Sequence, residues 1–292
     1  MRLTGRINPI TNFSLLTDLS AQDLPKGTAT FVTSLYDIGR ETWPKFSRSF
    51  SSYLQRFKHL LALDINLVIF GENSLKPFVK KYRKQLTSKT RFLTKPFIHL
   101  PAYKHKHRIE CVLDSESFKK DNGKLGHPEA FSAEYLIVVN SKVPLVGEVV
   151  RRNPFNTTHF FWVDAGYVAV SDDTGYDVMR VIIPAGTQWR PDPLLSSSEK
   201  VTYIQLHDPD LYANMTQLHK QRLAPAVSGG FFGGAQKVMS YYARLYNKCL
   251  LYQLAEGEVG EDQGVALQAY FEHPRVFHLV KGDWFDAYRL FH

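Results

Sequence analysis

The chain has 292 residues, a formal net charge of +8 at pH 7, 44% hydrophobic residues and 22% charged residues. These ordinary proportions exclude a disordered, collagen-like or coiled-coil chain, and the length allows one large or two small domains. No stretch approaches the ~18 consecutive apolar residues of a membrane-spanning helix, and residues 1–20 lack the apolar core of a signal peptide. Because there are only two cysteines, Cys111 and Cys249, we expect a reducing, cytoplasmic setting without a disulfide framework.

The first seventy or so residues predict a β-α-β unit behind an N-terminal arm. Residues 1–27 are polar and irregular, so we assign them to the arm and residues 28–292 to a single domain. A β-branched, apolar run over 28–35 predicts a buried strand, and a second run over 67–70 ends at Gly71. Residues 45–63 have apolar side chains at helical spacing. A crossover helix between two strands builds a parallel sheet, which binds ligands at the C-terminal ends of its strands.

The positive charge is concentrated in one segment. Residues 74–109 contain eleven Lys or Arg residues and no acid, whereas the rest of the chain has 25 basic and 28 acidic residues. We expect part helix and part loop here, with two open interpretations. Residues 76–108 are either a solvated surface or a binding surface for a polyanion or an anionic membrane. No recognition-helix, zinc-finger or RNP pattern accompanies the charge, so nucleic acid is not an expected partner.

The rest of the chain contains both helical and strand patterns. Apolar spacing predicts helices over 128–143, with a kink or boundary at Pro144, over 235–255, capped at Gly257, and over 261–271. Apolar, β-branched runs predict strands over 159–163, 178–183 and 201–206. Together with the β-α-β unit, this order predicts an α/β fold with helices flanking the sheet in one domain.

The triplet Asp164-Ala165-Gly166 comes directly after the apolar strand over 159–163. A carboxylate at the C-terminal end of a buried strand faces the ligand side of a parallel sheet, where it can hold a divalent cation. The alternative is a turn begun by Asp164, in which Gly166 supplies a positive φ.

Four glycines surround two phenylalanines in the run 229–234, just before the long helix. As a loop, this run would let the backbone approach an anionic ligand at the helix N-terminus. Phe231 and Phe232 would then wall a sugar or a base. The alternative is a flexible turn with two core phenylalanines.

Two further segments contain candidate site residues. Glu261, Asp262 and Gln263 open the last predicted helix. They are either ordinary capping residues or, in a cleft, a general base at Asp262 with a hydroxyl partner at Gln263. Near the C-terminus, His278 is a structural residue or a ligand, and Trp284 is a stacking platform for a sugar or a core residue.

Six segments, taken in this order, resemble the HtrL/YibB family of bacterial and viral proteins over roughly residues 28–286. They are TATFVTSLYDIGR (28–40), Asn140-Ser141-Lys142 followed by Asn153-Pro154-Phe155-Asn156, FFWVDAG (160–166), GGFFGG (229–234), EDQG (261–264) and FHLVKGDW (277–284). The family is placed with GT-A-type glycosyltransferases, so the resemblance implies a GT-A-like, Rossmann-like mixed sheet. It also implies transfer of a sugar from a nucleotide-sugar donor, a UDP-sugar, with Mn²⁺ or Mg²⁺. One bacterial member lies beside lipopolysaccharide-core genes, which implies a glycan or glycolipid acceptor in surface polysaccharide or lipopolysaccharide synthesis.

The resemblance implies roles for individual residues. The nucleotide-sugar would bind the first strand and its loop, the end of the second strand, the helix lysine and the acidic triplet, that is Thr33, Ser34, Tyr36, Asp37, Arg40, Asn73, Lys142, Asp164, Ala165 and Gly166. The donor sugar and the acceptor would face Gly230, Phe231, Phe232, Gly233, Gln263 and Trp284. Asp262 would be the catalytic base, and Asp164 and His278 would be the metal ligands.

One departure from the GT-A pattern concerns the metal. The usual acidic motif has two aspartates flanking one residue, whereas Gly166 stands at the second position here. Asp164 would hold the cation alone or through water, or the reaction would need no metal. The enzyme would be cytoplasmic, with an anionic acceptor or the inner membrane face meeting residues 76–108. The alternative function is a non-catalytic polyanion- or membrane-binding protein on a degenerate transferase scaffold.

Overall fold

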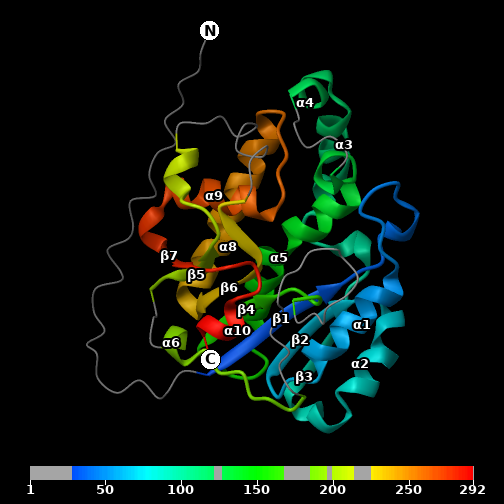
Figure 1. Ribbon diagram of the computed structural model, residues 1–292, viewed down its shortest axis with the longest axis vertical. Coiled ribbons are helices and arrows are strands. Elements are labelled where there is room, and N and C mark those ends of the chain that lie inside the picture. The colour runs from blue at the N-terminus through cyan, green and yellow to red at the C-terminus, as the bar shows by residue number, and fades with distance from the viewer. Residues whose placement is uncertain (1–27, 122–126, 168–184, 196–198, 214–224, 292) are drawn as a thin grey trace.

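The computed structural model contains a mixed sheet between two layers of helices (Figure 1). It describes residues 28–121, 127–167, 185–195, 199–213 and 225–291. In this part of the chain the sheet has seven strands in the order β3-β2-β1-β4-β6-β5-β7. The strands are β1 Ala29–Leu35, β2 Asn66–Gly71, β3 Thr90–Thr94, β4 His159–Val163, β5 Val201–Gln205, β6 Val227–Ala235 and β7 Phe277–Lys281. β6 runs antiparallel to both of its neighbours, and the other pairings are parallel. The predicted α/β class, a mixed sheet flanked by helices in one domain, is confirmed.

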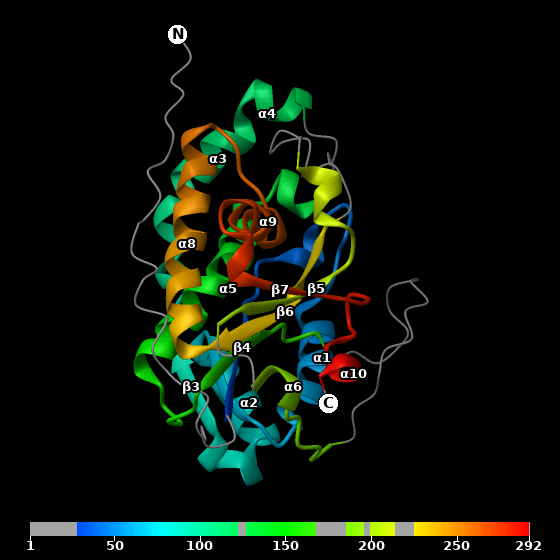
Figure 2. The ribbon, with the colours of Figure 1, turned by 90° about the vertical axis from the view of Figure 1, so that its left-hand side faces the viewer.

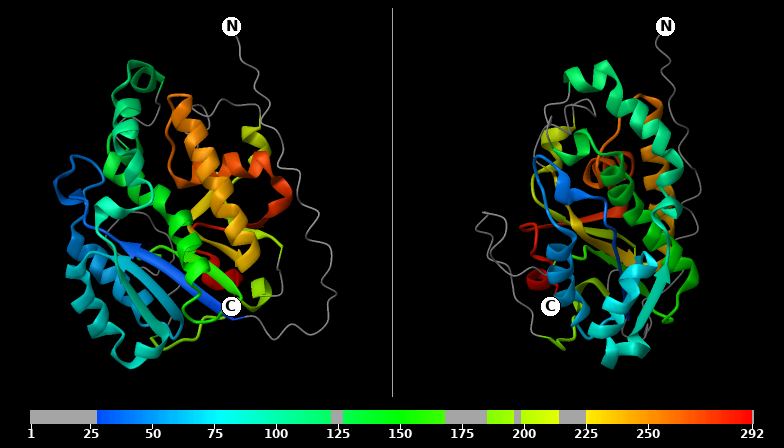
Figure 3. Two further views of the ribbon diagram at one scale, coloured as in Figure 1. Left: turned by 180° about the vertical axis from the view of Figure 1, so that it is seen from behind. Right: turned by 90° about the vertical axis from the view of Figure 1, so that its right-hand side faces the viewer.

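Helices cover both faces of the sheet (Figure 2). One face packs against α3 Lys106–Asp114, α4 Glu116–Asp121, α5 Ala133–Arg152, α8 Gln236–Ala255 and α9 Asp262–Glu272. The other packs against α1 Phe50–Leu61, α2 Lys76–Tyr82, α6 Asp192–Leu195 and α10 Ala287–Leu290. Figure 3 shows α5 and α8 side by side on the first face, where they pack on each other. No helix within the described ranges is both long and apolar enough to cross a bilayer.

Most predicted elements are confirmed, because their apolar patterns match the buried faces. The strands β1, β2, β4 and β5 and the helices α8 and α9 lie within two residues of their predicted bounds. Gly257 follows α8 with a φ of 73°, as expected of a residue that ends a helix. The arm over 1–27 and the strand over 178–183 lie outside the described residues.

Three elements differ from the prediction. The first helix begins at Phe50 rather than residue 45, because the Ser49 side chain accepts a hydrogen bond from the Ser52 amide and caps it. The basic segment contains the edge strand β3, whose partly exposed residues show no clear alternation of burial. Helix α5 continues through Pro144 to Arg152 and ends at Asn153, whose φ is 37°.

The glycine-rich run is not a loop, which corrects the prediction. Residues 229–234 lie within β6, where Phe231 and Phe232 are 0% and 1% exposed and belong to opposite hydrophobic clusters. Gly233 faces the backbone of β4, because a Cβ there would lie 2.7 Å from the Phe161 Cα. The glycines let β6 pack closely, and both phenylalanines stabilise the core.

We expect Gly233→Ala to lower the free energy of unfolding by about 2–3 kcal/mol, because the added methyl meets backbone atoms that cannot move aside. Urea denaturation monitored by circular dichroism measures this change. Gly166→Ala is the matched control, since its Cβ would lie at an ordinary 3.7 Å from the Arg56 Cδ. Equal stability of the two variants would contradict the expectation.

Candidate functional site

Three charged side chains from three elements meet at the C-terminal edge of β4. Lys142 comes from α5, Asp164 follows β4, and Asp262 opens α9. The Lys142 Nζ lies 3.0 Å from Asp164 Oδ1 and 2.9 Å from Asp262 Oδ2. The side chains of Lys142 and Asp262 are 8% and 6% exposed, whereas that of Asp164 is 33% exposed. In this charged triad Lys142 and Asp262 are therefore buried, and Asp164 is the carboxylate that a ligand can reach.

Hydrogen bonds from the sheet hold the triad in place. The Trp162 Nε1 donates to Asp164 Oδ1 at 2.7 Å, and the Asp164 amide donates to the Gly230 carbonyl at 2.9 Å. The Lys142 Nζ also donates to the Gly229 carbonyl at 3.1 Å. The ammonium thus donates hydrogen bonds to Asp164 and to the Gly229 carbonyl, and it forms an ion pair with Asp262. A phosphate that contacts Lys142 would compete with these three protein groups for the ammonium.

The triad keeps a positive charge at a site that burial would otherwise neutralise. Burial alone lowers the pKa of Lys142, but Asp164 and Asp262 outweigh it and raise that pKa above its ordinary value. Burial raises the pKa of Asp262, Lys142 opposes the shift, and the charge of Asp164 adds to it. Lys142 thus allows a buried and a partly exposed carboxylate to lie close together.

Two glycines of β6 make room for the site. A Cβ on Gly229 would lie less than 3.0 Å from the Asp262 carboxylate, so only glycine lets this strand pass beside it. A Cβ on Gly230 would lie 2.7 Å from the Tyr167 ring and 3.3 Å from the Trp284 Nε1. Trp284 thus lies beside the site, whereas Phe231, Phe232 and Gly233 lie deeper in the sheet.

The residues predicted to bind the nucleotide gather at the same edge of the sheet. Thr33 and Ser34 are buried near the end of β1, and Asn73 follows β2 and is exposed. The Tyr36 Oη donates to the Lys95 carbonyl at 3.0 Å, and Asp37 accepts from the Gly39 amide at 3.0 Å. Ala165 and Gln263 are buried at 6% and 7% exposure, and Gly166 lies beside α1. The structure brings these residues together, and their contact with a nucleotide stays a prediction.

The residues predicted to hold a metal ion do not form a ligand set. His278 lies on β7, three strands away from β4, and adjacent strands are about 4.8 Å apart, so about 14 Å separate the two strands. Its Nδ1 lies 3.3 Å from the Thr202 Oγ1. Across the described ranges, no three His, Cys, Asp or Glu side chains are grouped to hold a metal. Asp164 and Asp262 are close to each other, but Lys142 already lies between them, so this donor set does not fit a divalent cation.

The structure also places residues at the site that the sequence pattern did not indicate. Arg56 of α1 lies beside Gly166, and Tyr167 packs under Gly230 and accepts from the Ala287 amide through its hydroxyl. Tyr135, at the start of α5, stacks on Arg40. In the sequence, each of these residues looks like an ordinary helix or turn residue. Only the packing of distant segments shows that it lies at the site.

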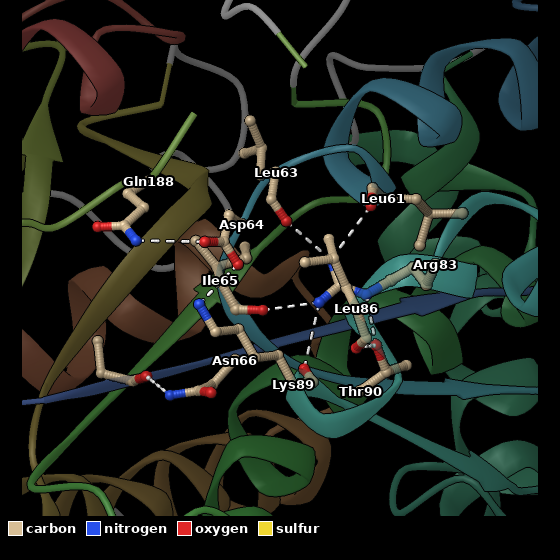
Figure 4. A network of polar contacts seen from close by, with 11 residues as sticks. Leu61, Leu63, Asp64, Ile65, Asn66, Arg83, Leu86, Lys89, Thr90 and Gln188 are labelled. Carbon is tan, nitrogen blue, oxygen red and sulfur yellow. Dashed lines mark hydrogen bonds and ion pairs between the residues drawn. The ribbon is translucent and has the colours of Figure 1, made fainter. Parts of the chain in front are cut away.

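The basic segment is not exposed and unpaired throughout. Arg83 is 2% exposed and donates hydrogen bonds to backbone carbonyls (Figure 4). Other residues are paired with acids, as Lys89–Asp64 at 2.7 Å, Lys95–Glu148 at 3.1 Å, and Lys106 with Glu110 and Glu134. The exposed residues are Lys76, Lys80, Lys81, Lys84, Arg91, Lys104 and Arg108.

The lysines after α2 are remote from the charged triad. Helix α2 follows the C-terminal end of β2, and the chain then returns to the start of the parallel strand β3 at Thr90. Lys84 and its neighbours therefore lie toward the opposite edge of the sheet from Asp164.

Comparisons with known proteins match nearly the whole chain. The family model described as "Bacterial protein of unknown function (HtrL_YibB)" matches residues 27–292. Protein HtrL of Escherichia coli strain K12 is 26% identical over 287 residues, which cover 91% of this chain and 93% of that protein. The crystal structure of mouse xyloside xylosyltransferase 1, apo form, is similar with a TM-score of 0.43 and 12% sequence identity, covering 87% of this chain and 85% of that chain.

Proposed function

This chain belongs to the HtrL/YibB family, and we propose that it is a GT-A-like glycosyltransferase that moves a sugar from a nucleotide-sugar donor, a UDP-sugar, to a glycan or glycolipid acceptor. The observation that carries the proposal is the charged triad at the C-terminal edge of β4, next to the end of β1. Open sheets of this type bind ligands at that edge. The synthesis served would be that of a surface polysaccharide or lipopolysaccharide.

In the proposed reaction the bond between the sugar C1 and the phosphate oxygen breaks, and the diphosphate leaves with the electron pair. The acceptor oxygen bonds to C1 and gives its proton to a base. Asp164, which is one third exposed, is the triad's carboxylate that can reach sugar or acceptor hydroxyls. Asp262 was the base expected from the sequence, but its burial and its contact with Lys142 favour a role in positioning Lys142.

We expect Asp164→Asn to reduce donor turnover at least about 100-fold, because the amide keeps the shape but loses the charge at the reacting edge. Release of nucleoside diphosphate from the donor sugar, with and without acceptor glycans, measures turnover. Asp192→Asn is a matched control, since Asp192 is exposed and pairs with Arg190 at 3.1 Å. Equal turnover in the wild type and in Asp164→Asn would contradict the assignment.

Calorimetric titration with UDP, GDP and CMP tests the proposed function itself. We expect UDP to bind more tightly than the other two. If none of the three nucleotides binds, the transferase proposal fails and the non-catalytic polyanion- or membrane-binding function is favoured instead.

A peripheral membrane contact is a separate part of the proposal. The exposed lysines Lys80, Lys81 and Lys84 are candidates for contact with an anionic surface, on a part of the molecule remote from the triad. Liposome flotation with and without anionic lipid tests it. Variants for this assay should replace only the three exposed lysines and keep Arg83, because Arg83 is buried.

A further inference from the structure

Arg40 lies in an aromatic cage beside the site. It follows β1 at the start of a 3-10 helix over Arg40–Thr42. The guanidinium carbon lies 4.9 Å from the ring centre of Trp43 and 5.8 Å from those of Tyr53 and Tyr135. Its Nη1 donates to the Tyr53 hydroxyl and its Nη2 to the Phe46 carbonyl at 3.1 Å. Aromatic faces attract a cation and orient it, so the guanidinium is held rigidly.

The caged guanidinium has no acidic partner in the described part of the chain. No carboxylate there lies within 4.0 Å of Arg40, although other half-buried or buried cations of this edge, Lys95 and Lys142, each have one. The Arg40 Nε is buried and makes no hydrogen bond with the described residues. A partly desolvated cation without a counter-ion is costly, and its planar donors match the oxygens of a phosphate.

Tyr135 connects Arg40 with the charged triad. Burial raises the pKa of Tyr135, the negative charges of Glu261 and Asp262 raise it further, and Arg40 lowers it. All three charges therefore act on the same ring. β1, which precedes Arg40, pairs with β4, which precedes Asp164. Arg40 thus lies at the triad's edge of the sheet, on the side of β1.

The triad cannot supply the positive charge that a diphosphate needs. The Lys142 ammonium lies within 3.1 Å of three protein oxygens, two of which belong to carboxylates. The same ammonium lies between Asp164 and Asp262, so these two carboxylates do not fit a divalent cation. Charge compensation must come from another group at this edge.

We propose that the diphosphate of the nucleotide-sugar binds the caged Arg40 guanidinium, which takes the part of a divalent metal ion. This inference rests on the proposed function and deepens it. Asp164 then faces the sugar, and Arg40 offsets the charge of the leaving diphosphate.

Calorimetry with uridine and UDP, each in EDTA and in Mn²⁺, tests the proposal on the wild type, Arg40→Gln and Arg48→Gln. Arg48 is the matched control, because it also stacks on Tyr53, at 5.4 Å. We expect Arg40→Gln to weaken UDP binding at least about tenfold and to leave uridine binding unchanged, since uridine has no phosphate. Arg48→Gln should change UDP binding less than about twofold. UDP binding by the wild type should likewise differ less than about twofold between EDTA and Mn²⁺.

The outcomes separate this inference from the function on which it rests. UDP binding that needs Mn²⁺, or that is equal in the wild type and Arg40→Gln, overturns the role of Arg40 and keeps the transferase. Absence of all nucleotide binding overturns the transferase itself. If Arg40→Gln does not fold, a need for Mn²⁺ in the wild type still overturns the proposal, and Trp43→Leu tests the cage. Trp43→Leu, which opens the cage but keeps the guanidinium, should weaken UDP binding and not uridine binding.

Discussion

Replacement of Arg83 by methionine is expected to lower the free energy of unfolding by at least about 4 kcal/mol, because hydrogen bonds to a buried charged group contribute about 1.5–3 kcal/mol each. Arg83 is 2% exposed and makes five such bonds (Figure 4). Its partners are the carbonyls of Leu61, Leu63, Ile65 and Lys89 and the Thr90 hydroxyl, at 2.6 to 3.2 Å.

The network joins the end of α1 to the starts of β2 and β3, so its loss removes five hydrogen bonds between these elements. Burial lowers the pKa of Arg83 to about 10, which leaves the guanidinium charged at neutral pH. Lysine cannot replace it, because a single ammonium cannot reach five acceptors in a plane.

Urea denaturation measures the effect, with Lys84→Met as the matched control. Lys84 is the next residue along the chain and is exposed, so its replacement should change stability by less than about 0.5 kcal/mol. A similar small loss for Arg83→Met would show that Arg83 does not hold these elements together.

Replacement of Lys142 by methionine is expected to cost about 3–5 kcal/mol of stability near neutral pH, because it leaves Asp262 buried without its counter-ion. The aliphatic chain of methionine fills most of the volume of the lysine, so the loss comes mainly from the missing charge. The double variant Lys142→Met/Asp262→Asn should recover part of the loss, since it removes the buried negative charge as well.

The loss should depend on pH in a defined direction. Burial raises the pKa of Asp262, and removing Lys142 raises it further. A carboxyl whose folded pKa lies above its unfolded value destabilises the protein as pH rises through that interval. The difference in stability between the wild type and Lys142→Met should therefore shrink as the pH falls from about 7 to about 5.

Thermal and urea denaturation at several pH values test this expectation. Lys95→Met is the matched control, because Lys95 pairs with Glu148 at 3.1 Å but both side chains retain 15–20% exposure. Its replacement should cost at most about 1 kcal/mol. A pH-independent loss in Lys142→Met would indicate that packing, and not charge, holds the triad.

Apolar patterns within one segment were sufficient to predict the helices and strands that bury such a pattern. The buried strands β1, β2 and β4 are short apolar runs. The apolar residues at helical spacing in α8 are buried, namely Val238, Tyr242, Leu245, Tyr246, Cys249, Leu250 and Leu254. These patterns predict the elements correctly because burial of apolar side chains is the dominant stabilising term in folding. A helix or strand that buries one face therefore has apolar residues at the spacing of that face. The strand β3 was missed because an exposed edge strand needs no such pattern.

The glycine-rich run shows where local rules fail. Glycine is unfavourable within strands, so four glycines favour a loop. In the protein the reason for them lies in other segments, because Gly229 passes beside Asp262 and Gly233 passes against β4. A close approach between distant segments leaves no periodic signal in either one.

Residue patterns along the chain were enough to predict the α/β class, most helices and strands, and the position of Asp164 at the end of a buried strand. The packing of distant segments was needed to show that Lys142 joins Asp164 to Asp262, that His278 lies three strands away, and that Arg83 is a buried donor rather than a surface charge. Periodicity indicates whether a segment has an apolar face, whereas the partner of a polar group depends on which distant segment packs against it. The site of this protein consists of such partners.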